Sequence, residues 1–184
     1  MQKSIVWEGL EYDTEEHCNV NFLETGIMVR SEIEGWAGVK AVYAEYILTL
    51  NLDWAVREIE IHFTVGAAEH SYNFIRHASG HWTDATGTLF RQFGECRFVD
   101  ISLTPFTNTL AIKKLTGHQQ KRFKVAYICI PDLTYAAVEQ VYQALGSGRY
   151  RYENLDTRFS AELIADEFGL VSEYPGLFMT LSKD

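Results

Sequence analysis

Residues 58–65 read Glu-Ile-Glu-Ile-His-Phe-Thr-Val, so apolar Ile59, Ile61, Phe63 and Val65 alternate with polar side chains. A period of two is typical of a β-strand that has one face in the core and the other in water. A helix would instead place its apolar residues three and four positions apart. This stretch therefore favours a half-buried strand and makes β-structure the starting expectation for the chain.

The same alternation recurs elsewhere in the sequence. Residues 98–103 and 159–163 alternate in the same way, and short runs around Tyr72 and Tyr150 carry aromatic pairs on one strand face. Glycine, a turn residue, punctuates these runs at ten positions: Gly26, Gly35, Gly66, Gly80, Gly87, Gly94, Gly117, Gly146, Gly148 and Gly169. Short strands at this spacing predict a mainly β fold, an antiparallel sheet that is strongly curved or closes into a barrel, with short helices.

A repeated pattern suggests that the chain contains an internal duplication. Tyr46 recurs as Tyr127, and Trp54 recurs as Tyr135, both 81 residues later. Such self-similarity predicts a fold with pseudo-two-fold symmetry. It also bears on residues 133–145, whose composition and flanking residues favour a helix, whereas the duplication aligns them with the strand described first. Both structures stay open for this segment, and the repeat favours the strand.

The length and composition of the chain indicate one globular domain. It has 184 residues, of which 47% are hydrophobic and 22% are charged, with 4 Trp, 10 Tyr and 11 Phe against 3 Pro. This is too apolar for a disordered chain, and no Pro- or Gly-rich linker divides it. We expect a single domain over residues 1–184 that consists of two related halves, roughly 1–100 and 101–184.

Charge and hydropathy argue against several classes of binding partner and against a location in the membrane. Sixteen basic and 25 acidic side chains give a net charge of −9, which repels nucleic-acid phosphates and anionic membrane surfaces. No apolar run approaches the roughly 20 residues of a bilayer span, so we expect neither nucleic-acid binding nor integral membrane association. Because the first residues lack a secretory signal pattern, we expect a cytoplasmic protein.

Known catalytic and metal-binding motifs are absent from the sequence. There is no nucleophile elbow, zinc-protease motif, phosphate-binding loop or dinucleotide fingerprint. Cys18, Cys96 and Cys129 lie far apart, so we expect buried reduced thiols. His77 and His81 flank a Ser-Gly pair that disfavours the helix needed to make them joint ligands. We therefore expect no catalytic residues, no metal and no cofactor.

Two segments combine polar side chains with aromatic ones at turns. Residues 104–109 read Thr-Pro-Phe-Thr-Asn-Thr and follow the strand that carries Asp100, while residues 174–176 read Tyr-Pro-Gly. Hydroxyl and amide side chains at a turn supply hydrogen-bonding groups at the mouth of a sheet. Asp100 shares its strand face with an aromatic residue, so two interpretations stay open: a polar anchor in an apolar cavity, or a structural aspartate with hydrogen-bond partners.

These segments also carry a resemblance to a known family. With Gly80-His81-Trp82, residues 94–96 and residues 169–178, the run Thr-Pro-Phe-Thr-Asn-Thr-Leu at 104–110 resembles the bacterial putative glycolipid-binding family, formerly a domain of unknown function. The likeness spans nearly the whole chain. It implies a symmetric, strongly curved antiparallel sheet with short helices that binds an amphiphile, and it supplies no catalytic residues.

We therefore predict that the sheet encloses an apolar cavity for an amphiphilic small molecule, a glycolipid or a fatty acid, without catalysis. Aromatic residues would form the cavity wall and polar residues would orient the headgroup; the candidates are Trp82, Phe106 and Tyr174 for the wall, and His81, Asp100, Thr104, Thr107 and Asn108 for the headgroup.

Two alternatives belong to other functional classes. One is a small hydrolase or isomerase acting on an amphiphilic substrate, with His81 and Asp100 as acid and base. The other is a non-catalytic β-scaffold that forms a homodimer through an exposed sheet edge at residues 43–50.

Overall fold

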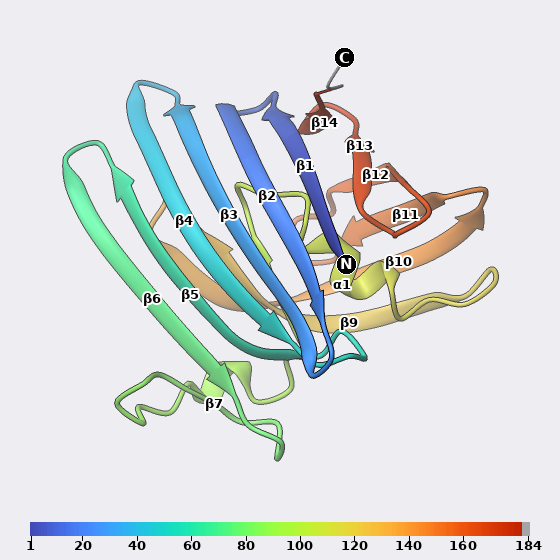
Figure 1. Ribbon diagram of the computed structural model, residues 1–184, viewed down its shortest axis with the longest axis horizontal. Coiled ribbons are helices and arrows are strands. Elements are labelled where there is room, and N and C mark those ends of the chain that lie inside the picture. Colours follow the sequence, from blue (N-terminus) through green and yellow to red (C-terminus); the bar gives the residue numbers. More distant parts are fainter. Residues whose placement is uncertain (182–184) are drawn as a thin grey trace.

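The computed structural model describes residues 1–181, which form one 14-stranded sheet and two short helices (Figure 1). The elements are β1 (Gln2–Gly9), β2 (Asp13–Leu23), β3 (Gly26–Ala37), β4 (Lys40–Leu50), β5 (Val56–Val65), β6 (Ala68–Arg76), β7 (Trp82–Thr83), η1 (Arg91–Phe93), β8 (Phe98–Ile101), α1 (Asn108–Ile112), β9 (Gln120–Cys129), β10 (Thr134–Gly146), β11 (Arg149–Asn154), β12 (Ser160–Ala165), β13 (Val171–Tyr174) and β14 (Phe178–Thr180). The mainly β expectation is confirmed.

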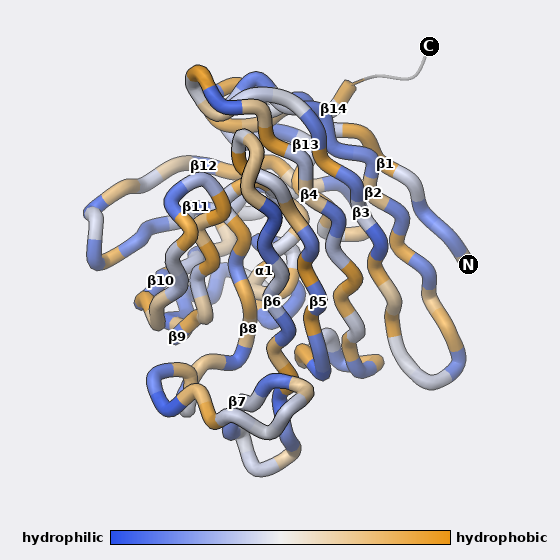
Figure 2. Tube along the Cα trace, turned by 90° about the vertical axis from the view of Figure 1, so that its left-hand side faces the viewer, coloured by the Kyte–Doolittle hydropathy of each residue, from blue (hydrophilic) through white to orange (hydrophobic). Residues whose placement is uncertain are grey.

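The strand predicted at residues 58–65 is formed as expected. In β5, Ile59, Ile61 and Phe63 are buried, whereas Glu60 and His62 between them are exposed. The alternation of apolar and polar residues is visible along the neighbouring strands in Figure 2. One face of these strands therefore lines the core and the other faces solvent.

The order of strands in the sheet is β7-β6-β5-β4-β3-β2-β1-β14-β13-β12-β11-β10-β9-β8. Neighbours are antiparallel except β8 and β9, which are parallel. The first and last strands of the chain thus pair in the middle of the sheet, where Trp7 of β1 lies opposite Thr180 of β14. Both halves of the sequence contribute to one continuous sheet.

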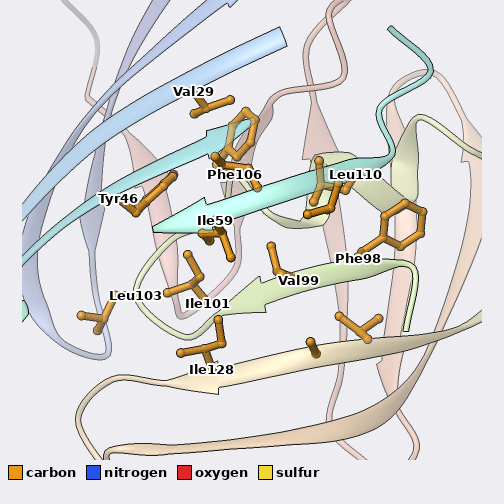
Figure 3. Close-up of a cluster of buried hydrophobic side chains, with 14 of the residues drawn as sticks. Val29, Tyr46, Ile59, Phe98, Val99, Ile101, Leu103, Phe106, Leu110 and Ile128 are labelled. Atoms are coloured by element: carbon orange, nitrogen blue, oxygen red, sulfur yellow. The ribbon is translucent and has the colours of Figure 1, made fainter. Parts of the chain in front are cut away.

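The expectation of a barrel or a strongly curved sheet is wrong, because the sheet stays open between β7 and β8. The physical reason is the segment that joins β6 to β9. Its strand β8 and helix α1 lie between strands β3–β6 on one side and strands β9–β12 on the other in Figure 2. Figure 3 shows Val99, Phe106 and Leu110 of this segment packed with Val29 and Ile59 from β3 and β5. Side chains therefore fill the inner face that a barrel would enclose.

The sheet edge predicted for dimerisation is also wrong. Strand β4, which contains residues 43–50, pairs with β3 along one side and with β5 along the other. Its backbone groups are therefore occupied by the ladder and are unavailable to a second chain. A homodimer that uses another surface stays a prediction.

Residues 134–146 form strand β10, so the helical alternative for this segment is wrong. A residue with a positive φ stands before each of the two strands that the repeat aligns. Leu133, just before β10, has a φ of 56°, and Trp54, shortly before β5, has a φ of 65°. The structure contains the hairpin runs β4–β6 and β9–β11 that the 81-residue repeat aligns. Their origin by duplication stays a prediction.

Two further expectations concern cysteines and membrane spans. Cys18, Cys96 and Cys129 are buried free thiols, as expected. Among residues 1–181, no helix has the length and apolar character that crossing a bilayer requires.

Candidate functional site

A pocket of about 320 Å³ lies where β8 and the following loop meet the strands of the C-terminal half. The rest of its wall comes from α1, β9, β11, β13, β14 and the β1–β2, β11–β12 and β13–β14 turns. Its lining residues are Glu11, Tyr12, Asp100, Ile101, Ser102, Thr104, Asn108, Tyr127, Tyr152, Asn154, Thr157, Phe159, Tyr174, Leu177 and Phe178. Aromatic rings, hydroxyls, amides and carboxyls thus share one hollow, which is the composition of a small-molecule site.

Asp100 is the most enclosed charged group of this pocket, with 9% of the residue exposed. Its Oδ1 accepts a hydrogen bond of 2.8 Å from the Thr107 hydroxyl, and its Oδ2 accepts one of 2.6 Å from the Gln140 amide. Burial raises the pKa of Asp100, and these two hydrogen bonds oppose the rise. The sequence left two interpretations open for Asp100, and the structure contains elements of both. The carboxyl has hydrogen-bond partners within the protein, and it also lines a pocket.

The hydrogen bonds continue behind Asp100 into a buried polar network. The Tyr142 hydroxyl donates to the Gln140 side-chain carbonyl at 3.3 Å, and it accepts from the Asn108 amide at 2.8 Å. Every member is buried. A satisfied buried network fixes the positions of its members, so the network holds Asp100 and Asn108 in place at the pocket wall.

Four tyrosines, Tyr12, Tyr127, Tyr152 and Tyr174, form much of the aromatic wall. The rings of Tyr152 and Tyr174 lie edge to face with centroids 6.0 Å apart, and Phe178 lies 6.1 Å beyond Tyr174. Burial is the main reason that the pKa values of Tyr127, Tyr152 and Tyr174 are raised, and the Asp100 carboxyl raises them further. These phenols therefore stay uncharged and keep their O–H groups as donors.

The structure brings half of the predicted site residues together in this pocket. Asp100, Thr104, Asn108 and Tyr174 line it, although they come from β8, a loop, α1 and β13. Thr107 does not line the pocket but contacts a residue that does. Its hydroxyl donates to Asp100 and accepts from the Ile101 backbone N–H at 3.3 Å.

The other three predicted residues lie outside this pocket. Phe106 is fully buried in the core (Figure 3). Trp82 is also fully buried, and its indole N–H donates to the Cys96 carbonyl at 3.1 Å. His81 is exposed in a turn, where it stacks on His77 with ring centroids 4.2 Å apart. The expected cavity wall of Trp82 and Phe106 is therefore a packed core.

A second buried carboxyl, Glu16 of β2, was missed by the sequence analysis. Its Oε1 accepts hydrogen bonds from Ser31 at 2.6 Å, from Thr104 at 2.8 Å and from Tyr46 at 2.9 Å. Its Oε2 is buried and has no partner among the described residues. Burial raises the pKa of Glu16 to about 7. The sequence feature that could have identified Glu16 is its position in an alternating strand, where it shares a face with Cys18 and two other buried residues of β2.

Residues 4–180 match the sequence profile of a family described as "Putative glycolipid-binding". The chain belongs to this family. The structure is similar to the crystal structure of a DUF1089 family protein from Pseudomonas aeruginosa, with a TM-score of 0.81 and 30% identity over 90% of this chain and 92% of that chain. A comparison with curated proteins found no match.

Membership of the putative glycolipid-binding family confirms the resemblance inferred from the sequence. The run at residues 104–110, its most specific part, contributes Thr104 and Asn108 to the lining of the pocket. The residues most specific to the likeness thus lie beside Asp100 and its hydrogen-bond network.

Proposed function

We propose that the protein binds the headgroup of a glycolipid or a similar amphiphile in the Asp100 pocket, without catalysing a reaction. The observation that carries this proposal is a buried carboxyl, held by Thr107 and Gln140, in a hollow whose wall includes four tyrosines. Membership of a family described as putative glycolipid-binding supports it.

The chemistry of the wall suits a polyhydroxylated ring. Carboxylate oxygens accept more than one hydrogen bond each, so Asp100 keeps acceptor capacity beyond its two bonds within the protein. Asn108 and Thr104 add polar groups next to it. Flat aromatic faces such as those of Tyr152 and Tyr174 cover the apolar face of a sugar ring and exclude water from it. The pocket therefore offers both polar contacts and apolar cover.

The alkyl chain of the amphiphile is proposed to lie at the mouth of the pocket rather than in the core. Phe106 and Trp82 are tightly packed, and opening that core would cost the contacts of fully buried rings. By contrast, Phe159 at the pocket is 40% exposed, and Leu177 lies near it in the same wall. These apolar side chains give the first part of an alkyl chain a surface to contact.

A binding role without catalysis is also supported by the surroundings of Asp100. Its side-chain partners among the described residues are a threonine and a glutamine, neither of which is an acid or a base at neutral pH. The alternative pair of His81 with Asp100 has no shared partner in the described part of the chain, since His81 contacts Ser79 and His77.

Native mass spectrometry of freshly purified protein, before and after lipid extraction, tests this proposal. We expect a co-purifying amphiphile or binding of octyl glucoside by the extracted protein. The Tyr174→Ala variant should bind octyl glucoside at least about tenfold more weakly, since a large aromatic contact is lost. Tyr150→Ala is the matched control, because Tyr150 lies two residues from Tyr152 on β11 but does not line the pocket. Absence of any bound amphiphile, or equal affinity for the two variants, would refute the proposal.

A further inference from the structure

We infer that the Asp100 pocket selects a headgroup that carries a positively charged amine, as in an amino sugar, over uncharged and anionic headgroups; this inference rests on the headgroup site proposed above. It adds a charge preference to that site and names the class of ligand. The charges of the lining residues, the partners of Asp100 and the arrangement of the tyrosines support it.

The pocket wall carries negative charge that no lining residue balances. Of its fifteen lining residues, Glu11 and Asp100 are acidic, and Lys, Arg and His are absent from the set. The chain as a whole adds to this field with a net charge of −9. A phosphate, sulfate or carboxylate headgroup would therefore meet repulsion and would find no cationic partner in the wall. This disfavours a free fatty acid as the ligand.

Asp100 is a buried carboxyl that lacks a cationic partner in the protein. Five ion pairs occur among the described residues, and Asp100 belongs to none of them. Its partners, the Thr107 hydroxyl and the Gln140 amide, are neutral donors. Buried carboxylates are normally paired with a cation or bound to a metal. An ammonium group of the ligand would supply the missing charge through a charge-assisted hydrogen bond, which is stronger than a neutral one.

The aromatic wall favours the same sign of charge. Tyr12, Tyr127, Tyr152 and Tyr174 line the pocket together with two phenylalanines. The face of an aromatic ring is negative because of its quadrupole, and it attracts ammonium groups within about 6 Å of the ring centre. Several rings beside a carboxylate thus favour a cation and give an anion no comparable stabilisation.

The polar side chains of the wall favour an amine that also bears hydroxyls. Ser102, Thr104 and Asn108 lie in the wall beside Asp100. A quaternary ammonium group could not use them, because it has no hydrogen-bond donors. An amino sugar presents an ammonium group to Asp100 and hydroxyls to these side chains, so its functional groups match the wall better than those of either a simple sugar or a quaternary amine.

Three octyl glycosides with the same tail test the inference by calorimetric titration near neutral pH: the glucoside, the glucosaminide and the glucuronide. Each is used as the monomer, at physiological salt and at high salt, which weakens attraction to the outer surface. We expect the glucosaminide to bind at least about tenfold more tightly than the glucoside, and the glucuronide more weakly still. Asp100→Asn should weaken binding of the glucosaminide far more than binding of the glucoside, so that the preference falls to near unity. The control Glu34→Gln, which removes an exposed acid of β3, should keep the preference.

The outcomes separate this inference from the proposed function. Binding of the glucoside with no preference for the amine, or a preference that persists in Asp100→Asn, would overturn the inference alone. Failure of all three glycosides to bind would overturn the proposed function and this inference with it. If Asp100→Asn does not fold, Glu11→Gln at the exposed rim should lower the preference, and so should acidification through the pKa of Asp100 in the unmodified protein. A preference unchanged by both would count against the inference.

Discussion

Replacing Glu16 by Gln should stabilise the protein at high pH and have little effect at low pH. Glu16 is 2% exposed, its Oε1 accepts from three hydroxyl groups, and its Oε2 is buried without a partner among the described residues. An ionised carboxyl in such a place is costly because burial removes its hydration. Gln has almost the same shape, its carbonyl oxygen can replace Oε1 as the acceptor for these hydroxyl groups, and it never ionises.

The magnitude follows from the pKa of Glu16, which burial raises from 4.5 to about 7. This difference corresponds to roughly 3 kcal/mol between the protonated and the ionised form. Because the pKa is raised on folding, the stabilising contribution is complete below about pH 4.5 and is lost as the pH rises through about 7. The wild type should therefore lose roughly 3 kcal/mol of unfolding free energy from this group over that window, and Glu16→Gln should not.

Urea denaturation at a series of pH values measures this effect. We expect the unfolding free energies of the wild type and Glu16→Gln to differ by less than about 1 kcal/mol near pH 4.5, and the variant to gain by up to about 3 kcal/mol near pH 8. The control Glu34→Gln removes an exposed carboxyl of β3 and should follow the wild type at every pH. A difference that stays constant across this pH range, or a variant less stable than the wild type at pH 8, would refute the reasoning.

Two further predictions concern packing and backbone, and both are checked by the same denaturation measurement. Phe106→Ala should cost about 3–5 kcal/mol because the ring is fully buried, whereas Phe159→Ala, at a 40% exposed position, should cost about 1 kcal/mol or less; equal costs would contradict the packing. Gly35→Ala should cost at least about 2 kcal/mol, since a Cβ there would lie 2.0 Å from the Asp13 carbonyl oxygen and the φ is +148°. Gly38→Ala, where a Cβ would meet open space, should cost clearly less.

The strands were predictable from the sequence where local alternation decides them. Residues 58–65 became part of β5 with the expected faces buried, because a period of two specifies a half-buried strand without reference to the rest of the chain. The place of a strand in the sheet is a non-local property. Residues 43–50 look like an edge strand in isolation, but they lie in β4, between two partners.

Closure of the sheet was not predictable for the same reason. A barrel requires β7 and β8 to pair, and β7 has only two residues. The segment that carries Phe106 and Leu110 instead packs against the inner face (Figure 3). The sequence indicated an excess of aromatic residues but not whether their rings surround a cavity or fill it, because that depends on a segment distant in the chain.

The candidate site was predictable in part. Asp100, Thr104, Asn108 and Tyr174 were identified from polar and aromatic residues at turns, and the fold places them around one pocket. Gln140 was missed, although it holds Asp100. It lies 40 positions away on β10, and its role depends on the pairing of β8 and β10 with β9. Such a partner has no local signal.

The two buried carboxyls differ in a way that assigns them different roles. Glu16 is enclosed by Ser31, Tyr46 and Thr104, and with a pKa of about 7 it is largely protonated below neutral pH, so folding does not require a cation beside it. Asp100 instead has one neutral donor on each oxygen and forms part of the wall of an accessible pocket. Only at Asp100 can a charge carried by a ligand reach the carboxyl. A preference for an amine should therefore disappear in Asp100→Asn and survive in Glu16→Gln, even though Thr104 contacts Glu16 and also lines the pocket.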